Sequence, residues 1–564
     1  MIIGIDLGTT NSLVAYYAED GVRVIPNALG KNLTPSVVAV DDNDEILIGE
    51  TAKEYGALHP TRVASVFKRS MGTEKKYKLG NHDFLPEELS SLVLKSLVES
   101  AEAYIGEKVT EAVISVPAYF DENRRKATKR AGEMAGLTVE RIISEPTAAA
   151  VAYGLYEKKE NTRFLVFDLG GGTFDVSILE LFENILEVRA VAGDNYLGGE
   201  DFTTVIIRKF LDKYDLSMDE LTGKEQDLLY RAAEEGKKKF CTEGEISFEL
   251  NIKDEKRPFQ LTLREFEKLC EPLLEKIRKP VQRSLADAHI RLNDIDEVVL
   301  VGGATRLPVV RDFIIHQFHK FPSVQMNPDE AIAIGAAIQA AMKERRSEVK
   351  EVILTDVCSF TLGTEVSVSC MGGGFESGHF CPIIERNTVI PASHTERLYT
   401  LHDNQTELLI KVLQGESRFA ENNLLLGQLE INVPKGKAGQ ESVDVTYTYD
   451  INSLLEVQVK VVSTGEEKKM YIKGNDNDMT LEEMKQRMEE LSYLKIQPRD
   501  KEENRLPLLR GERLYEEASG DTRRYLEQIL SEFENVLKRG TREEINDART
   551  LFLERLEEIE NSMR

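Results

Sequence analysis

Two segments far apart in the chain match each other, and this match restricts the fold more than any other feature of the sequence. The segments are 2–11 (IIGIDLGTTN) and 165–175 (LVFDLGGGTFD). Each is an apolar run that contains Asp-Leu-Gly at its end, continues into a tight turn and leads to a second apolar run, at 13–17 and 176–181. Apolar runs joined by a glycine-containing turn are typical of β-hairpins. The duplication predicts two related half-domains that face each other across a cleft.

The residues of the two turns favour an anion as the ligand. Glycines let the backbone approach a ligand closely and direct several N–H groups at it. Thr9, Thr10 and Thr173 add hydroxyl donors, and Asp6 and Asp168 occupy matching positions in the two segments. Carboxylates beside a polyanion require a cation between them, and Mg²⁺ prefers such oxygen ligands. We therefore expect a phosphate site with Mg²⁺, held by Asp6 and Asp168 largely through water.

Other phosphate-binding signatures do not occur in the sequence. No Gly-Lys pair is followed by Ser or Thr, so the chain has no Walker A loop. No strand-like run leads into the Gly-x-Gly-x-x-Gly pattern of dinucleotide-binding domains. The paired Asp-Leu-Gly turns are therefore the phosphate-binding candidates.

Length and charge limit the class of protein. A chain of 564 residues predicts two to four domains. Its formal net charge of -26 repels phosphate backbones, so we expect no nucleic-acid partner. The start of the chain has no basic stretch followed by an apolar one, and the apolar segment Ala331–Met342 is too short to span a bilayer. We expect no signal peptide and no membrane partner.

The five cysteines are scattered, odd in number and without a C-x-x-C pair. Free thiols in a reducing cytoplasm fit this usage best. Cys370, His379 and Cys381 lie close in sequence, but their spacing differs from that of the usual zinc ligands, so we expect no metal there.

The pattern of apolar residues changes twice along the chain. Residues 1–348 alternate β-branched runs with amphipathic helical segments, which is typical of α/β architecture. The short segment 349–356 is too apolar for a solvated linker. Residues 357–474 show the period of two of half-buried antiparallel strands, and residues 475–564 show a helical period. The chain is therefore expected to be multidomain, with an α/β part, a β part and an α-helical part.

A series of motifs resembles those of the DnaK-type heat-shock chaperones, the 70-kDa heat shock protein family. They occur in the family's order over nearly the whole chain, as GIDLGTTNS (4–12), VPAYF (116–120), EPTAAAVAYG (145–154), FDLGGGTFDVS (167–177), LGGEDF (197–202), LVGGATRLP (300–308) and NPDEAIAIGAA (327–337). The resemblance implies a two-lobed, actin-like ATPase domain at 1–348, an interdomain linker at 349–356, an antiparallel β-sandwich that binds peptides at 357–474 and an α-helical lid at 475–564. Shortened segments near 73–86 and 240–266 resemble the HscC-like bacterial subgroup.

The resemblance also implies roles for individual residues. Lys68 resembles the family lysine that reaches the γ-phosphate of ATP and orients the attacking water. Glu145 and Asp175 resemble the carboxylates that complete the shell of water and metal, and Asp168 and Thr173 join them in the catalytic group. The implied ATP-binding residues are Thr9, Thr10, Asn11, Gly170, Gly171, Gly172, Gly198, Gly199, Glu234, Lys237, Lys238, Cys241, Gly302, Gly303, Arg306 and Asp329.

On the adenine side the sequence departs from the family pattern. Many relatives carry Arg and Ser where Lys238 and Cys241 stand, and Ser where Ala304 stands. An arginine plane stacks on adenine and a hydroxyl bonds its edge, and lysine and thiol do both less well. We therefore expect weaker nucleotide affinity and faster exchange.

By the same resemblance, Leu398, Leu401, Leu408 and Ile410 line the peptide cleft, although ordinary sheet core also explains such residues. Thr364 and Ser367 stand where relatives often carry larger apolar residues, so we expect an altered range of clients. The residues matched to communication between the domains are Pro117, Arg125, Arg141, Leu354 and Asp356.

The implied function is that of an ATP-dependent molecular chaperone, an ATPase that binds unfolded polypeptide and works with a J-domain co-chaperone. An exchange factor is expected to be dispensable. A small-molecule kinase on the same fold is one alternative, but the roughly 210 residues after Asp356 disfavour it. A non-cycling chaperone regulator or exchange factor is disfavoured by Lys68, Thr173 and Asp175, and an actin-like filament protein by the long C-terminal part.

Overall fold

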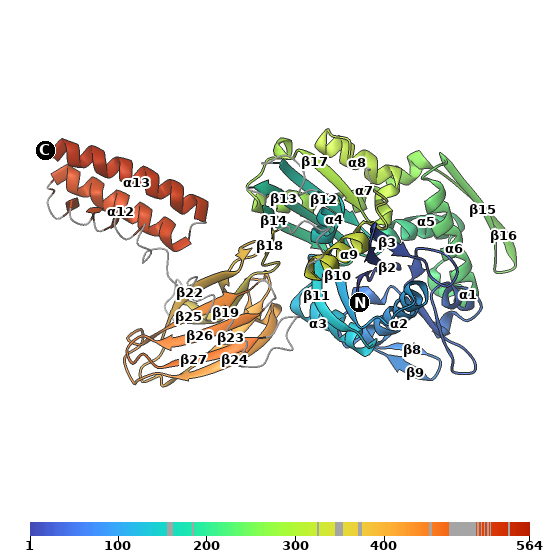
Figure 1. Ribbon diagram of the computed structural model, residues 1–564, viewed down its shortest axis with the longest axis horizontal. Helices are drawn as coiled ribbons and strands as arrows, with labels where there is room; N and C mark the ends of the chain where they lie inside the picture. Colours follow the sequence, from blue (N-terminus) through green and yellow to red (C-terminus); the bar gives the residue numbers. More distant parts are fainter. Residues whose placement is uncertain are drawn as a thin grey trace.

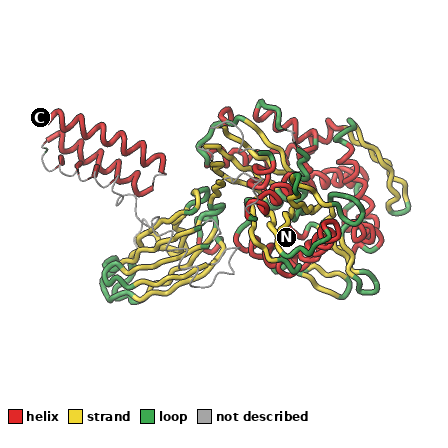
Figure 2. The backbone as a smooth tube through the Cα atoms, in the orientation of Figure 1, coloured by secondary structure: helices red, strands yellow, loops and turns green. Residues whose placement is uncertain are grey.

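The computed structural model describes residues 1–154, 162–182, 185–323, 326–344, 353–369, 375–450, 454–472, 520–539 and 542–563, with a few residues between 504 and 518. Figure 1 shows a large α/β part, a two-sheet β part beside it and a pair of helices at the C-terminal end. The tube in Figure 2 shows that strands dominate the middle part and helices surround the sheets of the first. Residues 349–352 of the expected linker, and most of 475–519 of the expected lid, lie outside the described residues.

The first half of the α/β part, called lobe I here, is built on a mixed sheet in the order β11-β10-β1-β2-β3. Strands β1, β10 and β11 run parallel, and β2 turns back antiparallel to β1. The helices that complete lobe I bury apolar faces against the sheet and against each other. The bounds are β1 Ile2–Asp6, β2 Asn11–Ala18, β3 Gly21–Ile25, β10 Glu111–Val116, β11 Thr138–Ser144, α2 Pro86–Ile105, α3 Glu122–Met134, α4 Glu145–Ala152 and α9 Ala331–Lys343.

The second half, lobe II, repeats this arrangement in a sheet of the order β17-β12-β13-β14-β18-β21, whose last strand, β21, comes from the β part. Strand β12 pairs antiparallel with β13 and parallel with β17, as β1 does with β2 and β10. The bounds are β12 Thr162–Leu169, β13 Phe174–Phe182, β14 Ile185–Asp194, β17 Glu297–Val301, β18 Ile353–Val357, β21 Val389–Ile390, α5 Gly199–Tyr214, α6 Gly223–Lys239, α7 Leu263–Asp287 and α8 Pro308–Phe318. The two β-hairpins predicted from the repeated sequence are therefore present, one in each lobe.

Helices α4 and α9 hold the two lobes together at the base of the cleft. They cross so closely that a Cβ added to Gly335 would lie 1.8 Å from the carbonyl oxygen of Ala148. Alanines on both helices and Gly335 on α9 permit this approach, because a larger side chain has no room there. The alanine-rich run from Ala331 is thus part of a buried core helix.

The β part is a sandwich of two four-stranded antiparallel sheets, β20-β19-β23-β24 and β22-β25-β26-β27. Alternate residues of the facing strands form its core; in β25, for example, Val443, Val445 and Tyr447 are fully buried. The predicted period of two is therefore confirmed. The bounds are β19 Leu362–Ser369, β20 Phe375–Ile384, β22 Ala392–Tyr399, β23 Glu407–Gln414, β24 Leu424–Asn432, β25 Ser442–Tyr449, β26 Leu455–Val461 and β27 Glu467–Ile472.

The C-terminal helices α12 (Gly520–Arg539) and α13 (Arg542–Met563) pack side by side. Their shared core includes Phe533 and Phe552, whose rings stack with centroids 4.7 Å apart. The helical period read from this part of the sequence is confirmed for the residues that the structure describes.

Strand β18, which contains the end of the expected linker, connects the sandwich to lobe II. It extends the lobe II sheet by pairing parallel with β14, with Ile353 opposite Ile185 and Thr355 opposite Glu187. Its other end pairs with β21 of the β part. A segment that joins two domains therefore also forms an edge strand of the first one.

Candidate functional site

The turns of the two hairpins touch each other across the cleft between the lobes. A Cβ added to Gly171 would lie 2.3 Å from Oγ1 of Thr10, and one added to Gly172 would lie 2.3 Å from Cγ2 of Thr9. Only glycine fits at either position without displacing the opposite turn. The structure therefore brings together the turns that the sequence repeat singled out.

Four carboxylates lie buried around these turns. Asp6 ends β1, Asp168 lies at the matching place in β12, Asp175 lies opposite Asp168 in β13, and Glu145 begins α4. All four are at most 7% exposed. Lys68 is the cation among them, and its Nζ donates to Oε1 of Glu145 at 2.9 Å.

The electrostatics of this cluster favour a bound cation. Burial, and then the nearby Glu145 charge, raise the pKa of Asp6 to about 7 and of Asp175 to about 8. The same two causes raise the pKa of Asp168 well above its usual value. One oxygen each of Asp168 and Asp175 is buried without a hydrogen-bond partner. Hard oxygen donors with unused lone pairs fit Mg²⁺.

The geometry also indicates how such an ion would be held. Within the described residues, no three His, Cys, Asp or Glu side chains lie close enough together to hold a metal ion directly. Mg²⁺ commonly keeps several of its waters. The carboxylates Asp6 and Asp168 therefore fit an ion bound largely through water, beside ligand phosphates.

The residues expected on the adenine side come together next to the phosphate turn of lobe II. Lys237 of α6 donates from Nζ to the carbonyl oxygen of Gly199 at 3.0 Å and pairs with Glu234 at 2.6 Å. Lys238 pairs with the other oxygen of Glu234 at 3.2 Å, with its side chain 65% exposed. Exposed Cys241 follows at the end of α6.

A second loop completes this side of the site. Gly302 has a φ of 82° and lies so close to β12 that a Cβ there would be 2.8 Å from Oδ1 of Asp168. A Cβ added to Gly303 would lie 2.6 Å from Oδ1 of Asp329, whose other oxygen accepts a hydrogen bond from Arg306 at 2.7 Å. Asn11 is exposed at the start of β2, and Gly198 caps the start of α5.

Pro117 and Arg125, two of the residues matched to interdomain communication, meet around the turn between β10 and α3. Arg125 donates to the carbonyl oxygens of Phe120 and Ala118, and the carbonyl oxygen of Pro117 accepts from the Phe120 amide. The ring of Phe120 lies 5.7 Å from Nζ of Lys68, so this turn contacts the catalytic candidate directly.

Arg141 and Asp356 do not pair with each other in this structure. Arg141 donates to Gln339 at 3.3 Å, and the Asp356 carboxylate accepts from the amide of Val357. The side chain of Leu354 lies outside the described residues, although its backbone pairs with Leu186.

The peptide-cleft candidates lie at one end of the sandwich. Leu398 and Leu408 are half-buried against its core, Leu401 is half-buried in the turn after β22, and Ile410 is a core residue with 3% exposure. Thr364 is fully buried, and its hydroxyl has no hydrogen-bond partner. Ser367 bonds Ser377 on the neighbouring strand at 3.0 Å. Cys370 lies outside the described residues.

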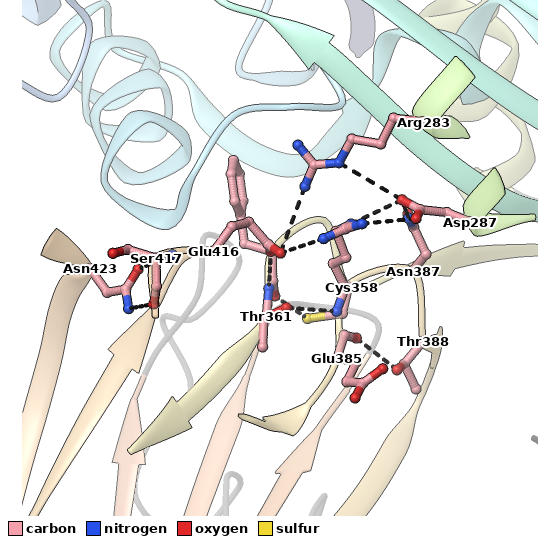
Figure 3. A network of polar contacts seen from close by, with 12 residues as sticks. Arg283, Asp287, Cys358, Thr361, Glu385, Asn387, Thr388, Glu416, Ser417 and Asn423 are labelled. Carbon is pink, nitrogen blue, oxygen red and sulfur yellow. Dashed lines mark hydrogen bonds and ion pairs between the residues drawn. The ribbon is translucent and has the colours of Figure 1, made fainter. Parts of the chain in front are cut away.

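A network of ion pairs joins the sandwich to α7, and the sequence reading missed it (Figure 3). The guanidinium of Arg386 donates to both oxygens of Asp287 at 2.9 and 2.8 Å, and to Glu416 at 2.6 Å. Asn387 donates to the same Asp287 carboxylate at 2.9 Å. Arg283 of α7 lies 3.7 Å from Glu416. We call these five residues the interdomain joint.

No helix of the described residues is both long enough and apolar enough to cross a membrane.

Comparison with known proteins places this chain in a family. The family model described as Hsp70 protein matches residues 2–563. The chaperone protein DnaK of Thermotoga petrophila is 42% identical over 503 residues, which cover 87% of this chain and 83% of that protein. The DnaK of Thermotoga neapolitana is 40% identical over 564 residues, covering 96% and 93%. That of Thermosipho africanus is 43% identical over 486 residues, covering 84% and 80%.

The HscC-like subgroup stays a prediction, since these relatives carry the DnaK name. Proteins of this family use ATP with Mg²⁺ and act on unfolded proteins, usually with J-domain co-chaperones. A match over the whole length and relatives above 30% identity settle the assignment: the chain belongs to the Hsp70 protein family and is an ATP-hydrolysing molecular chaperone.

Proposed function

We propose that the paired turns bind the β- and γ-phosphates of ATP with Mg²⁺, and that hydrolysis there controls how tightly the sandwich holds extended apolar segments of unfolded protein. The observation that supports this most is the contact of Gly171 and Gly172 with Thr10 and Thr9 beside the buried carboxylates. Phosphoryl transfer needs mainly positioning and neutralisation of charge. The turns position the phosphates, and Lys68 with Mg²⁺ would neutralise their charge.

Individual roles follow from this proposal. Lys68 orients the attacking water and neutralises charge on the γ-phosphate, and Glu145 holds Lys68 through their 2.9 Å ion pair. Asp6 and Asp168 hold the hydrated Mg²⁺. Asp175 and Thr173 complete the shell around the reacting phosphate. The adenosine lies between α6 and the loop at Gly302–Gly303.

The coupling between nucleotide and client is proposed to act through β18 and the interdomain joint. Both join the sandwich to lobe II. We propose that these contacts form in only one nucleotide state. A ligand shifts such an equilibrium by the difference between its affinities for the two states, on the order of 1–3 kcal/mol in typical allosteric proteins.

Partners and location follow from the same features. A J-domain protein is the proposed stimulator of hydrolysis. We propose that an exchange factor is dispensable, because the exposed Lys238 and Cys241 offer adenine weaker contacts than arginine and serine do. Free thiols fit a reducing cytoplasm.

The test is ATP hydrolysis, in single-turnover and steady-state form, with and without an apolar peptide and a J-domain protein. We expect the peptide and the J-domain protein to raise the rate in wild type, and Lys68→Ala to lower the single-turnover rate by about 100-fold or more, as for loss of a group that stabilises developing charge. Lys75→Ala is the matched control, since this lysine contacts Tyr77 away from the turns.

Equal rates for wild type and Lys68→Ala would contradict the catalytic assignment. Stimulation by a sugar in place of the peptide would favour a small-molecule kinase. Binding of ATP without any turnover would favour a non-cycling regulator.

A further inference from the structure

Arg69, directly after Lys68, reaches across the cleft from lobe I to lobe II. The two residues lie on a short 3₁₀ helix, Phe67–Ser70, which Val66 precedes with a φ of 57°. Left-handed backbone at a β-branched residue is strained, and such strain concentrates at functional sites. Nε of Arg69 donates to the carbonyl oxygen of Gly172 at 2.8 Å, and a terminal nitrogen pairs with Asp201 at 2.7 Å.

Each carbonyl group of the glycine turn in lobe II has a donor. The amides of Gly199 and Glu200, at the start of α5, donate to the carbonyl oxygens of Gly170 and Gly171 at 2.9 Å each. The third carbonyl, that of Gly172, takes its donor from Arg69. Two of these three donors, which anchor the turn, thus belong to lobe II itself, and the third comes from the opposite lobe.

These anchors determine where the N–H groups of the turn point. A trans peptide is planar, so the N–H of each residue points opposite to the carbonyl group before it. The bond from Arg69 to Gly172 therefore directs the N–H of Thr173 away from Arg69. Because Arg69 lies in lobe I, this last peptide is fixed only when the two lobes are closed on each other.

We propose that Arg69 is a positioning residue for ATP hydrolysis, which fixes the Gly172–Thr173 peptide when the cleft closes. This inference rests on the proposed function, in which the turn binds the phosphates. Asp201 supports the arrangement in two ways: it pairs with Arg69, and the same oxygen accepts from the amide of Gly198 at 2.8 Å. Lys68 and Arg69 lie on one short helix, so closure of the lobes brings both side chains to the site together.

The test compares Arg69→Met with Arg62→Met as a matched control. Arg62 also donates to main-chain carbonyl oxygens, those of Val40 and Asp41, but stays within lobe I. We expect Arg69→Met to lower the single-turnover rate of ATP hydrolysis by about 10- to 100-fold, the usual range for loss of one hydrogen bond from a charged donor. The dissociation constant of ADP should change by less than about threefold, because most contacts of the site remain. Arg62→Met should change neither value.

Two further measurements separate positioning from general damage. Added guanidinium ion, below denaturing concentration, should partly restore hydrolysis in Arg69→Ala, which a misfolded variant would not allow. Asp201→Asn keeps an acceptor for Gly198 but removes the ion pair, so it should lower the rate by a smaller factor than Arg69→Met.

A wild-type rate in Arg69→Met, or absence of rescue in an Arg69→Ala variant with wild-type ADP affinity, would overturn the inference. If Lys68→Ala also hydrolysed normally, the fault would lie in the proposed function instead. A wild-type rate of ATP hydrolysis in Arg69→Met, together with a strongly lowered rate in Lys68→Ala, would refute the role of Arg69 and leave the proposed function intact.

Discussion

The interdomain joint offers the sharpest test of coupling between the two ends of the molecule. Asp287→Asn removes the charge that holds Arg386 through two hydrogen bonds, at 2.9 and 2.8 Å, and weakens the bond from Asn387. The paired side chains are 28% and 17% exposed, so solvent screens them only in part. Hydrogen bonds to charged groups contribute about 1.5–3 kcal/mol each when one partner is removed. Allowing for the exposure, we expect a net loss of about 2 kcal/mol. This corresponds to a decrease of about 30-fold in the docked population, meaning the molecules in which the joint holds the sandwich against lobe II.

The assay is release of a fluorescent apolar peptide after ATP is added. In wild type, ATP should accelerate release, and in Asp287→Asn this acceleration should fall by up to about 30-fold, following the docked population. Peptide affinity with ADP should stay unchanged, because the joint lies outside the cleft candidates. Glu87→Gln, which breaks the exposed pair with Arg130 in lobe I, is the control and should have no effect.

A double-mutant cycle decides whether the pair itself carries the effect. Asp287→Asn and Arg386→Gln should together cost clearly less than the sum of their separate effects, because they remove one shared interaction. Strict additivity, or ATP-accelerated release at the wild-type rate in either variant, would refute the assignment of the joint to one nucleotide state.

Three other predictions follow from single positions. Lys238→Arg with Cys241→Ser should slow ADP release, measured by chasing a fluorescent nucleotide, because arginine stacks on adenine and serine bonds it better; unchanged release would refute the adenine assignment. Thr355→Val should favour the docked state of β18 and raise ATP-accelerated peptide release, since the Thr355 hydroxyl is buried without a partner; slower release would contradict this. Because burial raises the pKa of Asp6 to about 7 and of Asp175 to about 8, the protonated forms are favoured in the nucleotide-free fold. The unfolded carboxyls lose their protons near their ordinary pKa of about 4, so the thermal unfolding midpoint should fall as pH rises from about 4 towards 7–8 and level off above that. Mg²⁺ with ADP should bind more tightly at pH 8.5 than at pH 6; a midpoint that rises with pH over this window would contradict the carboxylate cluster.

The sequence was most informative where a local pattern fixes the structure. The Asp-Leu-Gly repeats predicted both hairpins, because strands and glycine turns are encoded within about 15 residues. The contact between the two turns came only from the structure. The period of two predicted the sandwich for the same reason. The alternation of buried residues in β25 follows directly from the pleat of a strand.

The joint and Arg69 could not be found in this way. Arg386 and Asp287 are 99 residues apart, and each is an ordinary charged residue in its own neighbourhood. Their pairing depends on how two domains dock, for which the sequence has no period or motif. Arg69 stands next to Lys68 in the sequence, but only the fold shows that it contacts the opposite lobe. The adenine residues were found through family resemblance, since neither spacing nor charge marks them.

Tyr119 links the phosphate site to the sandwich through a short chain of contacts. Its amide donates to Oδ1 of Asp175 at 3.3 Å, so its backbone position depends on that carboxylate. Its ring lies 4.6 Å from the ring of Phe360, just before the first strand of the sandwich, and its hydroxyl accepts from Arg283 of the joint at 3.2 Å. The alternative route follows β13 and β14 from the phosphate turn to β18 at their far end. That route runs through fully paired strands, whereas Tyr119 is held by single contacts that can change with the charge on Asp175. A change in the ligand of Asp175 therefore reaches Phe360 and the joint through this one side chain.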